Sequence, residues 1–205
     1  MTGMSMPEQT WYDGAARYLG MWMAMMVPMM LPSLAPVLLR YRRSVLAAGG
    51  LRSHGLTMMV GAGYYLSWAA LGVPAYGVSA GMMALEARWA TIAAGLMLLA
   101  AGIVQLTPWK ARQLARCREG AVCECRFLAT AGAAWRHGLE LGVRCALCCG
   151  TVMLALLTVG MMDLVAMAAV TLAITAERLT PAPLRAARVT GVAIIVLGLL
   201  TIVRM

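Results

Sequence analysis

Three cysteines lie close together in the string RCALCCGTVM, at Cys145, Cys148 and Cys149. Spacings of three and four residues place their thiols on one face of an α-helix. Thiolates are soft ligands that select metals such as Cu(I) and Zn²⁺. The pattern therefore indicates a soft-metal site, with copper as the first candidate and zinc as the second. The spacing leaves open the alternative that the three cysteines are small buried hydrophobic residues without chemistry.

Methionine thioethers could extend this group of sulfur ligands. Met153 lies one helical turn beyond Cys149 and shares its face. Met29 and Met30 lie in the string AMMVPMMLP, at about the depth expected for the cysteines in a membrane. Thioethers are also soft ligands, so these three methionines are second-rank candidates. Alternatively, the methionines fill irregular gaps in the packing.

Glu177 is the acidic candidate for the same site. A short turn near residues 161–163 makes the flanking helices antiparallel neighbours, and counting outward from that turn places Glu177 at about the depth of Cys145. An ionisable group within or at the edge of a membrane helix is a candidate for function. The alternative is an interfacial carboxylate paired with Arg178 or Arg144.

A basic stretch at 108–138 carries three further cysteines and a histidine. Cytosolic thiols stay reduced, and the string CREGAVCECR lacks the paired spacing of a zinc module. Whether these cysteines act with the other three stays open. The histidine of this stretch is His137. The cysteines of this stretch are Cys117, Cys123 and Cys125.

Composition determines the kind of element that holds these residues. The chain has 205 residues, of which 62% are hydrophobic and 12% charged, and its mean hydropathy is +0.79. This excludes a single water-soluble globule and intrinsic disorder. We predict an all-α transmembrane bundle that forms one domain over residues 1–205. The segments apolar enough to span a bilayer are 18–39, 56–79, 89–107, 139–160, 164–179 and 184–203.

Basic residues predict the topology of this six-helix bundle. Most of the 17 Lys and Arg would lie on one side, many of them in the stretch 108–138. The positive-inside rule then places both termini outside and makes 108–138 a cytoplasmic loop. The net charge of +9 thus reflects topology rather than a nucleic-acid partner. We expect a multi-pass protein of the bacterial inner membrane, with the lipid bilayer and a membrane or periplasmic protein as partners.

Two pairs of glycines predict how helices meet in this bundle. Gly95 and Gly102 are spaced by seven residues, as are Gly191 and Gly198. Small residues let two membrane helices approach closely. We therefore expect close helix packing at these positions.

Several strings together resemble a known family. They are AMMVPMMLP, QLTPWKARQLARCR, CALCCGTVM, GMMDLVAM and the pair Glu177-Arg178. The pattern resembles a bacterial family of predicted metal-binding integral membrane proteins, a domain of unknown function. The resemblance implies a membrane protein that binds metal. Two positions depart from the family pattern: Leu141 stands where the family usually has a histidine, and Gln113 stands where it tends to have a cysteine. His137 shares a helix face with Leu141 and Cys145, so the resemblance makes it a candidate ligand in place of that histidine.

The sequence thus favours binding of a soft metal, copper first, for metal handling or delivery. No Gly-rich phosphate loop, Ser-His-Asp arrangement or paired carboxylates favour an enzyme. One alternative is a membrane thiol-redox protein that uses the clustered cysteines. The other is a non-catalytic structural or scaffold subunit of a membrane complex.

Overall fold

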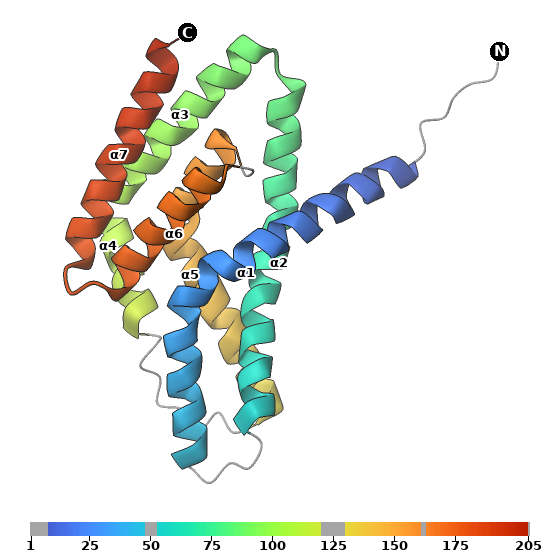
Figure 1. Cartoon of the computed structure of the whole chain (residues 1–205), viewed down its shortest axis with the longest axis vertical. Coiled ribbons are helices and arrows are strands. Elements are labelled where there is room, and N and C mark those ends of the chain that lie inside the picture. Colours follow the sequence, from blue (N-terminus) through green and yellow to red (C-terminus); the bar gives the residue numbers. More distant parts are fainter. Residues whose placement is uncertain (1–7, 48–52, 120–129, 161–162, 205) are drawn as a thin grey trace, which may run out of the picture.

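The computed structural model describes residues 8–47, 53–119, 130–160 and 163–204. These residues form seven helices, which confirms the all-α class (Figure 1). Most of them are longer than the predicted segments, and 108–119 is a helix that the sequence analysis did not predict. The helices are α1 (Glu8–Ala47), α2 (Ser53–Ala84), α3 (Ala87–Leu106), α4 (Pro108–Glu119), α5 (Ala131–Val159), α6 (Leu164–Leu179) and α7 (Pro183–Val203).

Five of these helices, α1, α2, α3, α5 and α7, are long and apolar enough to cross a membrane. The sixth predicted span, α6, has 16 residues, fewer than the roughly 20 that usually span a bilayer. The count of six spans is therefore not confirmed among the described residues. The beginning of α1 and the end of α7 lie at the same end of the molecule (Figure 1).

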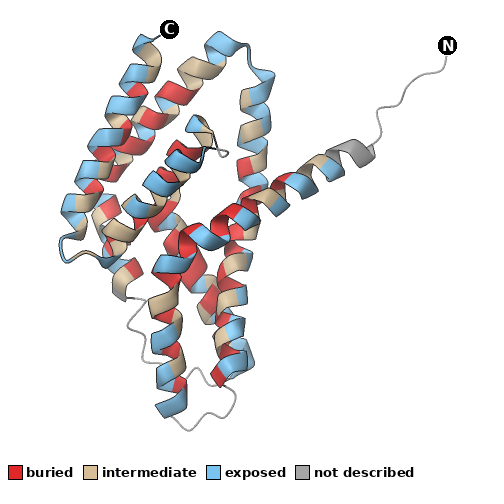
Figure 2. Cartoon of the chain, viewed as in Figure 1, coloured by how far each residue is buried: buried red, intermediate tan, exposed pale blue. Residues whose placement is uncertain are grey.

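Helix α1 bends part-way along its length (Figure 1). Three prolines, Pro28, Pro32 and Pro36, lie inside it. Each proline lacks the N–H that would bond the carbonyl four residues earlier, which is the usual cause of a kink. Figure 2 shows buried residues concentrated where α1 passes α2 and α5. The bent part of α1 therefore carries its methionines into the core.

Glycines set the closest contacts between helices. A Cβ atom added at Gly102 of α3 would lie 2.9 Å from the carbonyl oxygen of Gly191 in α7. A Cβ at Gly63 of α2 would lie 2.7 Å from the carbonyl oxygen of Trp135 in α5. The pairs α3–α7 and α2–α5 pack along each other, and the predicted packing role of Gly102 and Gly191 is confirmed.

Helix α4 lies inside the stretch 108–138 and packs against α5, with further contacts to α3 and α6. Lys110, Leu114 and Cys117 are buried, and their spacing of three and four residues puts them on one face. Arg112 and Arg116 point away from the bundle and are exposed. The first part of this basic stretch is thus an amphipathic helix that turns one cation and one thiol inward. Cys123 and Cys125 lie outside the described residues.

Candidate metal centre

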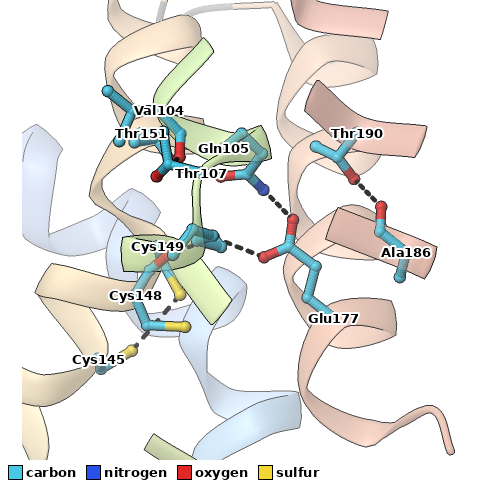
Figure 3. A network of polar contacts seen from close by, with 11 residues as sticks. Val104, Gln105, Thr107, Cys145, Cys148, Cys149, Thr151, Glu177, Ala186 and Thr190 are labelled. Atoms are coloured by element: carbon cyan, nitrogen blue, oxygen red, sulfur yellow. Dashed lines mark hydrogen bonds and ion pairs between the residues drawn. The ribbon is translucent and has the colours of Figure 1, made fainter. Parts of the chain in front are cut away.

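The three thiols of α5 lie together in the interior. Cys145, Cys148 and Cys149 are all buried, and all three are free cysteines. The Sγ atoms of Cys145 and Cys149 are 3.8 Å apart (Figure 3). A tetrahedral site with metal–sulfur bonds of about 2.3 Å, the zinc–thiolate value, sets its sulfurs roughly 3.8 Å apart. The spacing of these two sulfurs therefore suits a shared metal ion.

Cys117 brings a fourth thiol to this group from α4. Its side chain is buried and hydrogen-bonds to Cys148. This hydrogen bond and burial together raise the pKa of Cys117 above its usual range, so its thiol keeps its proton. The sequence alone leaves open whether Cys117 acts with the cysteines of α5. In the structure Cys117 contacts one of them, Cys148.

Two hydrogen-bond donors converge on the sulfur of Cys145. The hydroxyl of Tyr64, from α2, donates to Sγ over 3.1 Å. The guanidinium of Arg178, at the end of α6, donates to the same atom over 3.3 Å. The contact with Arg178 places the end of α6 at the level of Cys145, as the residue count predicts. The sulfur of Cys145 thus lies against one neutral donor and one cation.

Glu177 lies next to this group but faces a cation. Its Oε2 atom is 2.8 Å from Nζ of Lys110, and both side chains are 1% exposed. Its Oε1 atom accepts a hydrogen bond from Gln105, whose own oxygen accepts one from Thr151 (2.6 Å; Figure 3). Lys110 also donates to the carbonyl oxygen of Cys148 over 2.5 Å. Glu177 therefore balances the charge of Lys110, and Lys110 in turn hydrogen-bonds to the backbone of α5, the helix that carries the three thiols.

Neither of the two arginines suggested as partners of Glu177 takes that role. Arg178 turns to Cys145 and to Ser33 Oγ, over 2.9 Å. Arg144 is exposed and lies 3.9 Å from Glu140 on its own helix. The predicted pairing of Glu177 with Arg178 or Arg144 is therefore wrong, because the buried carboxylate pairs with Lys110.

The candidate methionines reach the same core, whereas His137 does not reach the thiols. Met29, Met30 and Met153 are buried in the core cluster that contains the three cysteines of α5. The ring of His137 stacks on Tyr41, with centroids 6.0 Å apart. Eight residues of helix separate His137 from Cys145, a rise of roughly 12 Å.

Among the described residues, no three His, Cys, Asp or Glu side chains form a group that could hold a metal ion. The side chains as they lie offer a pair of sulfurs, and Cys148 contacts Cys117 beside that pair. A third protein ligand would require a side-chain movement or a methionine sulfur.

Sequence reasoning missed Tyr64, Gln105 and Lys110. A lone glutamine in an apolar helix was a usable signal, because a buried amide needs partners. The spacing of Lys110 with Leu114 and Cys117 was another, since it marks the inner face of a short helix. Tyr64 gave no such signal, because its role depends on the packing of α2 against α5.

The fold and the site define a bundle of long apolar helices with free thiols and paired charges buried at its centre. A family model, PpoB2, whose description is "Copper chaperone", matches residues 19–201, and the chain belongs to this family. No curated protein and no solved structure matches the chain. The expected membership of a metal-related bacterial family and the preference for copper agree with this result.

Proposed function

We propose that this chain is a membrane copper chaperone, which binds Cu(I) between Cys145 and Cys149 and hands it to another protein. The observation that carries the proposal is the buried pair of sulfurs, 3.8 Å apart, with two donors on one of them. Cu(I) is the cargo. Its binding would displace the thiol protons, because thiolates are the ligands.

Five apolar helices and the directions of all the helices support a multi-pass protein of the bacterial inner membrane. We infer that α6 completes a sixth crossing, because it runs antiparallel to α7 and α1 begins on the side where α7 ends (Figure 1). An even number of crossings is required for both termini to lie outside. The recipient of the metal would then be a membrane or periplasmic protein.

The geometry favours delivery over permanent storage. A site with two sulfurs leaves Cu(I) open to a third soft ligand, so that an incoming thiol or thioether can bind before the first ligand leaves. Met29, Met30 and Met153 lie in the same core and could serve as transient ligands. Cys148 and Glu177 are further candidates, of which Glu177 would first have to leave Lys110.

A thiol-redox role is the second candidate function. The contact between Cys145 and Cys149 favours it, since the two sulfurs would need to close from 3.8 Å to about 2.05 Å to form a disulfide. Counting free thiols in the protein under oxidising and reducing conditions separates the two functions. A redox protein would lose two thiols reversibly, whereas the chaperone would keep them until metal binds.

The direct test is Cu(I) binding by the full chain, purified in detergent under reducing conditions and titrated against a Cu(I) chelator. We expect one tightly bound Cu(I) in the wild type and loss of that ion in the double variant C145S/C149S. The matched control, C123S/C125S, removes two cysteines from outside the described residues and should keep the ion. Unchanged binding in C145S/C149S would contradict the proposal.

A further inference from the structure

The guanidinium of Arg178 occupies a fixed place beside the sulfur pair. It spans from its own helix, α6, to Ser33 on α1 and Cys145 on α5. The hydroxyl of Ser33 donates its proton to the carbonyl oxygen of Met30 over 3.0 Å, so its oxygen lone pairs face the guanidinium. Arg178 is thus held by a neutral acceptor on one side, while its charge lies against a thiol.

Among the side chains that the structure describes, no carboxylate forms an ion pair with Arg178. Among the described residues, the ion pairs are Lys110 with Glu177 and Arg144 with Glu140. The buried carboxylate nearest in sequence, Glu177, is therefore used by Lys110. An unbalanced cation is unfavourable in an apolar interior, and it stabilises one negative charge placed next to it.

The charge that forms at the sulfur pair depends on the metal. Two thiolates and one Cu(I) ion carry one net negative charge, which the guanidinium cancels. Two thiolates and one divalent ion such as Zn²⁺ are already neutral, so the half-buried guanidinium would then remain an unbalanced cation. Both reactions release two thiol protons and transfer no electron, so the difference between them is electrostatic.

We propose that Arg178 makes the site select a monovalent soft ion over a divalent one. This inference rests on the proposed function and specifies its cargo, because it assigns the discrimination between Cu(I) and Zn²⁺ to one side chain that is not itself a ligand. Tyr64 donates to the same sulfur without charge, so it strengthens both complexes and does not discriminate.

The test measures the affinities of the detergent-purified full chain for Cu(I) and for Zn²⁺, each by competition with a chelator, and compares their ratio among variants. In R178Q we expect the preference for Cu(I) over Zn²⁺ to fall by about tenfold or more, the size of a lost hydrogen bond to a charged group. R178K keeps the charge and should retain most of the preference. The matched control is R118Q, since Arg118 is also half-buried and donates to a backbone carbonyl, that of Thr180, over 2.9 Å.

An unchanged ratio in R178Q would overturn the inference, as would equal losses of both metals in R178Q and R178K, which would indicate a structural role. If R178Q does not fold, S33A decides, because it removes the acceptor that holds the guanidinium beside Cys145. The preference for Cu(I) over Zn²⁺ should fall in S33A, and an unchanged ratio there would overturn the inference. Failure of the proposed function gives a different result. The wild type would then bind no Cu(I), or C145S/C149S would bind it as well as the wild type.

Discussion

The interface between α3 and α7 differs in kind from the centre formed by α4, α5 and α6. The first is built from glycines that let two backbones touch, as at Gly102 and Gly191. The second contains a buried ion pair, Lys110 with Glu177, beside four free thiols. The α3–α7 interface thus depends on close backbone packing, whereas the centre formed by α4, α5 and α6 contains charges and hydrogen bonds.

This difference indicates that the centre formed by α4, α5 and α6 is the candidate functional region. Close helix packing needs no buried charge, and α3 with α7 achieves it with small apolar residues. A buried ion pair often gives no net stability over apolar residues of the same size. Its presence beside the thiols is therefore better explained by the site it positions than by the stability of the fold.

The largest expected effect comes from breaking the ion pair. Lys110→Met leaves the Glu177 carboxylate buried without its cation, which should lower the free energy of unfolding by about 3–5 kcal/mol. Replacing both residues, as K110M/E177Q, should recover part of the loss. Thermal unfolding in detergent measures both. The exposed pair gives the control: Glu140→Gln should change stability by about 1 kcal/mol at most, and equal effects in the two pairs would contradict the prediction.

A smaller effect is expected at the glycine interface. A Cβ at Gly102 would lie 2.5 Å from Cγ1 of Ile195 as well as 2.9 Å from the Gly191 carbonyl, so Gly102→Ala should destabilise the bundle by about 1–3 kcal/mol. At Gly77 of α2, a Cβ meets nothing within 4 Å. Gly77→Ala should therefore stabilise by roughly 0.5–1 kcal/mol, because alanine favours a helix.

Measuring Cu(I) binding of the glycine variants tests whether the α3–α7 interface and the thiol group are independent. The Gly102 and Gly77 variants should bind Cu(I) like the wild type, because neither glycine touches the thiol group. A loss of copper binding in Gly102→Ala at a temperature where the protein stays folded would show that the two regions are coupled. Chelator competition below the unfolding temperature makes this measurement.

The sequence predicted the all-α class, the glycine packing and the shared face of the three cysteines, because each follows from local periodicity. It did not predict α4, since the basic residues of that segment obscured its apolar face. The partner of Glu177 was also missed, because Lys110 lies on a separate helix whose docking depends on long-range packing. Periodicity determines which residues share a face, but not which face of another helix meets them.

The smallest expected effect concerns two methionines of α1 and asks whether either contributes its sulfur to Cu(I) binding. Met30 is fully buried in the core, and Met23 packs against that core half-buried on the same helix. Leucine has nearly the volume of methionine, so each Met→Leu change should alter stability by less than about 1.5 kcal/mol.

Thioethers bind Cu(I) far better than they bind Zn²⁺. If Met30 contributes its sulfur, Met30→Leu should weaken Cu(I) binding by about tenfold and leave Zn²⁺ binding unchanged. A loss of this size is typical when a supporting group of a metal site is removed. Met23→Leu should change neither. Equal Cu(I) affinities in the two variants would show that Met30 only fills space in the core, as the glycines of α3 and α7 serve packing alone. The thiols would then bind copper without a methionine ligand from position 30.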